Sequence, residues 1–167
     1  NTTIMREKLA RLAVLFLILF LFSVPCELFS QTPGTLSFTV TTTAPDAGYG
    51  ADNLLAIWIQ SSTSVLPADF VKTKIKRASI GDANSHLQTW TTVSGRNVTD
   101  AVSGASRNSH GTVTFLWDGT NVPGTIVANA TYYIRTEMAW GDNDDALSSY
   151  AFSKGPTLFQ SNPANTA

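Results

Sequence analysis

Cysteine, histidine and surplus charge of one sign are all scarce in this sequence. Cys26 is the single cysteine, and it precedes a predicted signal-peptide cleavage point after Ser30. A chain cleaved there contains no thiol, which excludes disulfides, iron–sulfur clusters, thiolate zinc sites and covalent c-type haem. The presence of only 2 histidines argues against a dedicated zinc or copper site. A formal net charge of -1, without a long basic run, argues against nucleic-acid binding.

The N-terminus has the organisation of an export signal. A positive region precedes an apolar run: Met5, Arg6, Lys8 and Arg11, then Leu12–Val24. This run is shorter than the ~20 residues of a membrane-spanning helix. We therefore expect residues 1–30 to comprise a signal peptide with a few upstream residues, and the mature protein to be periplasmic or extracellular. An uncleaved anchor is one alternative, and lipidation of Cys26, which Pro25 disfavours, is another.

Beyond residue 30 the hydrophobic pattern repeats every two residues, which predicts β-strands. The expected strands are Leu36–Val40, Leu54–Ile59, Phe70–Ile75, Val113–Trp117, Tyr132–Met138 and a last one that includes Tyr150 and Phe152. Leu54–Ile59 is apolar throughout, which predicts burial on both faces, and the lysines at 72, 74 and 76 are expected on a solvent-facing side. We expect residues 31–160 to form one all-β, Ig-like antiparallel β-sandwich, followed by a polar tail at 161–167.

Two polar stretches interrupt this pattern. Ser79–Ser109 is rich in Ser, Asn and Gly and is expected to be a long loop with a short helix near Leu87–Trp90. Loops of that length are usually functional, so chemistry is expected there. Asp142–Asp145 suggests a calcium loop, but the spacing of a known calcium motif is missing and a polar turn is favoured.

A turn sequence in the last third of the chain suggests a sandwich architecture. It consists of Trp117-Asp118-Gly119-Thr120-Asn121, then Gly124 and Tyr132-Tyr133-Ile134. The Asp-Gly pair permits the positive φ of a tight turn, and the flanking aromatic residues are suited to fill a core. The pattern resembles the Ig-like domains of flagellar hook-cap proteins, although Ala130 stands where that pattern prefers glycine. This resemblance implies a fold and no function.

The segment Asp100-Ala101-Val102-Ser103-Gly104-Ala105-Ser106 resembles the D-x-x-[ST]-G-A-[ST] acceptor sequence of extracytoplasmic FAD:protein FMN transferases. Those enzymes attach FMN from FAD to the hydroxyl of the last residue. The resemblance implies that Ser106 is the acceptor and that Asp100 is a recognition residue. It also implies that Ser103, Gly104 and Ala105 belong to the recognised segment, the last two permitting close approach. An ordinary loop serine is the alternative for Ser106, since threonine is the commoner acceptor.

Six sequence elements occur in order along the chain: Gly34–Phe38, Asn53–Trp58, Phe70–Thr73, His86–Trp90, Asp100–Gly111 and Trp117–Thr120. Together they resemble a family of predicted periplasmic proteins, domain of unknown function 2271 (DUF2271), over most of the mature chain. This resemblance places the acceptor-like segment in an exported, thiol-free domain, where a covalently attached flavin is a reasonable redox cofactor.

The resulting hypothesis is an exported, non-enzymatic electron carrier with FMN attached to Ser106. Its expected partners are an FMN transferase and a membrane or extracellular redox protein. His110 is expected near the flavin or its phosphate, or else is an ordinary loop histidine. Several other residues have two interpretations, as flavin neighbours or as core and surface residues: His86, Trp90, Arg96 and Arg107. The alternative function is a cofactor-free structural or adhesive Ig-like module, with possible self-association through strand edges or aromatic patches.

Overall fold

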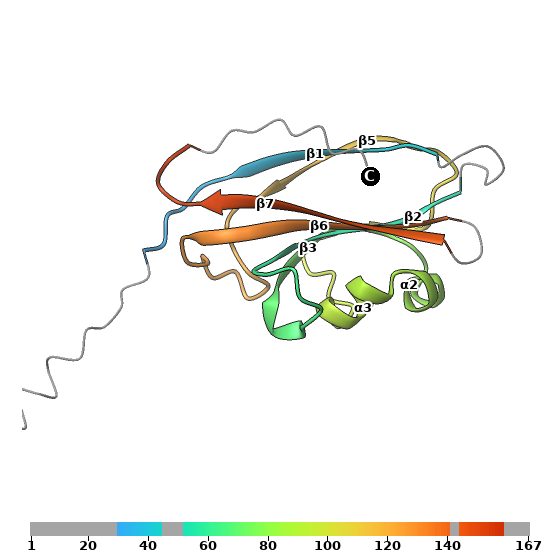
Figure 1. The fold of residues 1–167 in the computed structure, drawn as a ribbon, viewed down its shortest axis with the longest axis horizontal. Helices are drawn as coiled ribbons and strands as arrows, with labels where there is room; N and C mark the ends of the chain where they lie inside the picture. The colour runs from blue at the N-terminus through green and yellow to red at the C-terminus, as the bar shows by residue number, and fades with distance from the viewer. Residues whose placement is uncertain (1–29, 45–51, 141–143, 159–167) are drawn as a thin grey trace, which may run out of the picture.

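The computed structural model describes residues 30–44, 52–140 and 144–158. The predicted leader, apart from Ser30, and the predicted tail lie outside the described residues, as do residues 142 and 143 of the proposed polar turn. Among the described residues, no helix combines the length and apolar character needed to cross a membrane. Three layers are visible in Figure 1: a pair of strands, a larger sheet, and two short helices beneath that sheet.

The protein is rich in β-structure, and its strands form two sheets. The smaller sheet pairs β1 (Leu36–Thr42) with β5 (Gly111–Trp117). The larger sheet has the order β4-β3-β2-β6-β7. Its strands are β2 (Leu54–Gln60), β3 (Phe70–Arg77), β4 (Val102–Gly104), β6 (Ala130–Trp140) and β7 (Asp144–Lys154). All neighbours in it are antiparallel except β3 and β4, which run parallel. The five expected strands and the last strand are confirmed.

The main core lies between the two sheets. On β1, Leu36, Phe38 and Val40 turn inward while the intervening residues stay exposed, and β5 supplies Phe115 and Trp117. On the outer face, the hydroxyls of facing threonines lie within hydrogen-bond distance, as in Thr39–Thr114 and Thr41–Thr112. The alternating sequence pattern therefore fixed which face of these strands was buried, because neighbouring side chains on a strand point to opposite faces.

A second core lies between the larger sheet and the helices. Its buried members are Ala56, Trp58, Ala78, Ala83, Leu87, Trp90, Val93 and Ala139. β2 contributes to both cores: Leu55, Ile57 and Ile59 face the smaller sheet, whereas Ala56 and Trp58 face the helices. This placement explains why β2 is apolar throughout, and it confirms the predicted burial on both faces.

The region Ser79–Ser109 is not the long loop that we predicted. It contains α2 (Ile80–His86), α3 (Gln88–Ser94) and the edge strand β4. Ser79 begins α2 by accepting a hydrogen bond from the Asp82 amide at 3.0 Å. α2 buries only Ala83, so its sequence has no apolar periodicity from which a helix could be predicted. The expected helix near Leu87–Trp90 is confirmed and continues to Ser94.

A buried carboxylate on β6 holds the start of α3. Glu137 has no exposed surface, and it accepts hydrogen bonds from the amides of Thr89 at 2.9 Å and Trp90 at 2.7 Å. The residue that precedes the helix, Leu87, has no side chain able to cap it. The carboxylate therefore supplies the cap from another element and meets the positive end of the helix dipole. Burial lowers the pKa of Arg135, and the negative charge of Glu137 opposes that decrease.

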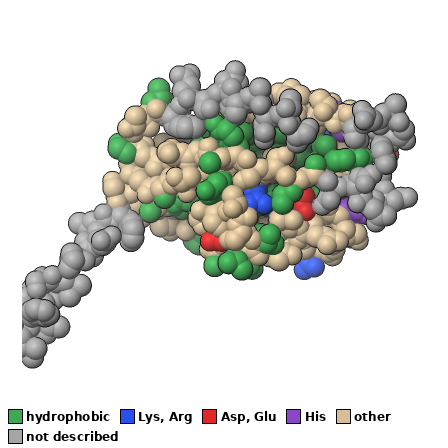
Figure 2. Space-filling model, viewed as in Figure 1, with side chains coloured by type: hydrophobic (Ala, Val, Ile, Leu, Met, Phe, Trp, Pro, Cys, Tyr) green, Lys and Arg blue, Asp and Glu red, His purple; other side chains and the backbone are tan. Residues whose placement is uncertain are grey.

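Exposed apolar side chains are distributed rather than gathered. Ile80, Val102 and Leu116 are among the large ones that remain exposed. On the face drawn in Figure 2, hydrophobic side chains reach the surface at several separate places. Scattered residues of this kind are usual on protein surfaces.

Replacing Glu137 by glutamine should lower the free energy of unfolding by about 2 kcal/mol. The glutamine side chain has one oxygen and one NH2 group, so it can accept only one of the two hydrogen bonds, and its NH2 group would face a backbone N–H that also donates. Urea denaturation followed by circular dichroism measures this change. Gln88→Ala is the matched control, since it removes only an exposed side-chain hydrogen bond from the same helix and should change stability by less than ~0.5 kcal/mol. Equal effects of the two variants would contradict a capping role.

Candidate functional site

The acceptor-like segment Asp100–Ser106 lies on the surface between α3 and β5. From Val102 to Ser109 every residue is exposed. The chain leaves α3 through Gly95 in a left-handed conformation, and both Arg96 and Asp100 have positive φ, at 66° and 58°. Three contacts then hold the segment in place, two with β3 of the larger sheet and one with the residue just before β2.

The first contact is on the helix side of β3. The Thr73 hydroxyl donates to the Asn97 carbonyl at 2.6 Å and accepts from the Trp90 indole at 3.0 Å. The Asn97 side chain accepts from the Thr99 amide at 3.0 Å, which shapes the turn before Asp100. Trp90 is therefore a core residue that positions the segment, as the alternative interpretation held, and it is not exposed toward a flavin.

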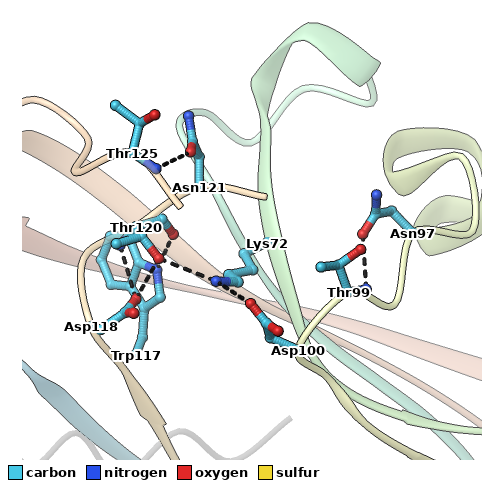
Figure 3. Close-up of polar contacts among 9 residues, drawn as sticks. All are labelled: Lys72, Asn97, Thr99, Asp100, Trp117, Asp118, Thr120, Asn121 and Thr125. Atoms are coloured by element: carbon cyan, nitrogen blue, oxygen red, sulfur yellow. Dashed lines mark hydrogen bonds and ion pairs between the residues drawn. The ribbon is translucent and has the colours of Figure 1, made fainter. Parts of the chain in front are cut away.

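The second contact joins Asp100 to a buried lysine (Figure 3). The Lys72 Nζ lies 3.0 Å from Asp100 Oδ2 and donates to the Thr120 hydroxyl at 3.1 Å. Thr120 in turn donates to Asp118 at 2.6 Å, and its carbonyl accepts from the Trp117 indole at 2.7 Å. The hydrogen bond from Thr120 holds the pKa of Asp118 below its usual value. This network joins β3, the acceptor-like segment and the turn that follows β5.

The predicted solvent-facing position of Lys72 is wrong. Its side chain is only 4% exposed, because β3 carries two register shifts against β2. Lys72 pairs with Ile59, whose side chain faces the main core, and paired residues share a face of the sheet. A simple alternation, which ignores bulges, assigns the wrong environment to this lysine.

The third contact lies at the far end of the segment. Asn53, just before β2, exchanges backbone hydrogen bonds with Arg107 at 2.7 and 3.0 Å, and its side chain donates to the Ser109 carbonyl at 3.1 Å. Between the second and third contacts, β4 pairs with the end of β3, and Ala105 and Ser106 connect β4 to Arg107. Both ends of the acceptor-like segment are therefore fixed while its side chains stay in solvent.

Ser106 borders a small surface cleft of about 280 Å³. Its lining residues are Asp52, Asn53, Leu54, Asp82, His86, Ser106, Ala139 and Trp140. These residues come from the start of β2, from α2 and from the end of β6. Among the described residues, nothing hydrogen-bonds to the Ser106 hydroxyl. The cleft therefore places an accessible hydroxyl beside an indole, an imidazole and two carboxylates.

The other predicted site residues lie around this cleft or away from it. Ser103, Gly104 and Ala105 are exposed on the segment itself. His110 does not line the cleft, and its two ring nitrogens are buried without a hydrogen-bond partner among the described residues. His86 does line it, whereas Trp90, which was considered with it, is buried in the second core.

Two arginines proposed as flavin neighbours also have defined places. Arg96 donates to the Asn84 side chain at 2.6 Å. Arg107 follows Ser106, and its positive charge adds to burial in lowering the pKa of Arg77, which pairs with Gly104. Two cationic residues thus lie close together beside the last residues of the segment.

Of the cleft residues, sequence reasoning named only Ser106 and His86 as site candidates, and it missed Asp52, Asp82 and Trp140 among the others. Trp140 lies two residues beyond the predicted strand Tyr132–Met138, at the end of β6, and that position alone does not indicate which other segment it meets. The described residues contain no group of three or more His, Cys, Asp or Glu side chains able to hold a metal ion. Comparisons with protein-family models, curated proteins and solved structures find no match for this chain.

Gly104→Ala should leave the free energy of unfolding unchanged within ~0.5 kcal/mol, because an added Cβ meets no atom within 4 Å and φ is not positive. Gly119→Ala is the contrasting variant. Gly119 has a φ of 78°, and its added Cβ would lie 3.0 Å from the Lys154 side chain. We expect that variant to lose about 1–2 kcal/mol. Urea denaturation of both proteins tests the pair, and a large loss for Gly104→Ala would show that the fold itself requires this glycine.

Proposed function

We propose that the protein is an exported flavoprotein electron carrier with FMN joined to Ser106 by a phosphoester. The observation that carries this proposal is the position of Ser106, an exposed hydroxyl on a segment fixed at both ends beside a cleft with aromatic walls. An acceptor for a second enzyme must be accessible, and its surroundings must leave room for the attached group. Ser106 meets both requirements.

The attachment reaction needs only FAD and a transferase. The Ser106 oxygen forms a bond with the phosphorus of the FMN half, and the phosphoanhydride bond of FAD breaks. AMP leaves with the bridging oxygen, and the serine proton passes to a base of the transferase or to water. No oxidant or reductant is consumed. The product keeps one negative charge on its phosphodiester, beside which Arg107 and Arg77 provide positive charge.

The residues of the cleft suit one part of a flavin. Its volume lies just below the usual range for small-molecule sites, roughly 300–1,000 Å³, so it would cover part of a three-ring system and leave the rest in solvent. Trp140 and His86 line the cleft with aromatic rings, side chains of a type that stacks on a flavin, and Leu54 and Ala139 add apolar surface. When bound, FMN supplies reversible electron transfer, and an exposed ring edge favours exchange with a membrane or extracellular partner.

The glycine in the segment supports recognition by a transferase. Nothing in the described fold occupies the space beside Gly104, so internal packing gives no reason for a glycine at this position. A partner that approaches the backbone closely does give one. The export signal, the extracytoplasmic location and the Ig-like class of the sandwich belong to the same proposal and rest on the sequence.

Co-expression with an FAD:protein FMN transferase should yield a yellow protein whose intact mass is raised by one FMN less one water. Ser106→Ala should remain colourless and unmodified. Ser109→Ala, which removes an exposed hydroxyl three residues beyond Ser106 and outside the acceptor-like segment, is the matched control and should still be modified. An unmodified, colourless wild-type protein would overturn the proposal, and the alternative function, a cofactor-free structural or adhesive module, would then be favoured.

Trp140→Ala should raise the fluorescence of the attached flavin, because an indole stacked on the ring provides a path for quenching. Steady-state emission of the modified protein, normalised to flavin absorbance, measures the effect. Leu116→Ala changes an exposed side chain on β5 and serves as the control. Identical emission from wild type and Trp140→Ala would mean that the flavin does not lie against this wall of the cleft.

A further inference from the structure

Lys72 is the most constrained charged group in contact with the acceptor-like segment. Its side chain is 4% exposed, and a buried ammonium needs acceptors and a negative partner to offset lost hydration. Its hydrogen-bond and ion-pair partners are the Thr120 hydroxyl and the Asp100 carboxylate. These partners belong to two separate chain segments, and Lys72 therefore holds both against β3 (Figure 3).

The ion pair is asymmetric. Asp100 is 67% exposed, so its carboxylate would regain hydration if released, whereas the buried Lys72 would lose its ion-pair partner at 3.0 Å and keep the charge of Asp118, which it reaches through Thr120. Asp100 also has a φ of 58°, a left-handed conformation that is unfavourable for a residue with a Cβ. Because the buried Lys72 needs a nearby negative charge, its ion pair with Asp100 opposes a change of the Asp100 backbone to a more favourable conformation.

The strand that follows Asp100 is weak by itself. β4 has three residues, all exposed, and it pairs only with β3 along one edge of the sheet. Ala101, between Asp100 and β4, donates its amide to the Val98 carbonyl at 3.0 Å, so the turn and the strand form one short unit. Contacts at the ends of this unit must therefore determine where Ser106 is presented.

We propose that Lys72 is a positioning residue for flavin attachment. By binding Asp100 it holds the turn and β4 against β3, and it presents Ser106 in an ordered segment to the transferase. Asp100 then acts at least partly through Lys72, in addition to any direct recognition. This inference rests on the proposed function, and it adds a residue that lies outside the acceptor-like segment.

The test compares initial rates of FMN transfer to purified wild type, Lys72→Met, Asp100→Asn and the double variant, with FAD and the transferase. Each single variant should be modified about tenfold more slowly, and the double variant should be no slower than the slower single one, because both changes break the same contact. Lys72→Arg should retain most of the rate, since the charge remains. Lys154→Met, on β7, is the control for loss of a lysine and should react as wild type does, because its Nζ donates to the Thr32 carbonyl and not to the acceptor-like segment.

Hydrogen–deuterium exchange of the unmodified proteins tests the positioning without the transferase. Exchange over residues 100–107 should rise in Lys72→Met and Asp100→Asn while β2 and β6 stay protected. Thr120→Val, which removes the second partner of Lys72, replaces Lys72→Met if that variant does not fold. If wild type is modified and Lys72→Met reacts equally fast, or if the single effects add, the inference is wrong. If wild type is never modified, the proposed function fails, and the exchange data alone decide whether Lys72 orders the segment.

Discussion

The placement of the functional region depends on one buried carboxylate beneath α3. Glu137 projects from the larger sheet and binds the first amides of the helix, so the helix is attached at its start to β6. His86 immediately precedes this point, and the chain leaves the other end of the helix at Gly95. Fixing one short helix therefore positions a wall of the cleft and the origin of the acceptor-like segment together. A seven-residue helix would be marginal without such tertiary support.

The sheet holds the segment from both of its faces. Lys72 and Thr73 are neighbours on β3, and neighbouring side chains on a strand point in opposite directions. Lys72 reaches Asp100 and the turn at Thr120, whereas Thr73 reaches the Asn97 carbonyl and Trp90 on the helix side. The segment is thus ordered by contacts at its ends and needs no deep pocket. Under the proposed function a covalent tether would make a shallow cleft sufficient, because attachment would keep the local concentration of the ring high.

The strands were predictable because alternation reports burial directly, as in Leu36, Phe38 and Val40 of β1. α2 was not predicted, because it buries a single alanine. α3 was expected near Leu87–Trp90, but its cap was not, because the capping carboxylate comes from a residue about fifty positions away in the chain. Lys72 was misplaced because two bulges on β3 change which side chains share a face. Trp140 and Asp82 meet Ser106 only through long-range packing, for which a local pattern contains no signal.

The separate sequence elements that suggested a family resemblance become one structural unit in the fold. Phe70–Thr73 contains the two residues of β3 that contact the segment from opposite faces of the sheet. His86–Trp90 contains the indole that donates a hydrogen bond to Thr73, and Trp117–Thr120 contains the second partner of Lys72. Asn53 closes the far end by pairing with Arg107. These elements contact the segment that contains Ser106 or the residues that hold it, whereas Gly34–Phe38 contributes Leu36 and Phe38 to the main core. Residues far apart in the sequence thus act together to fix both ends of one exposed segment.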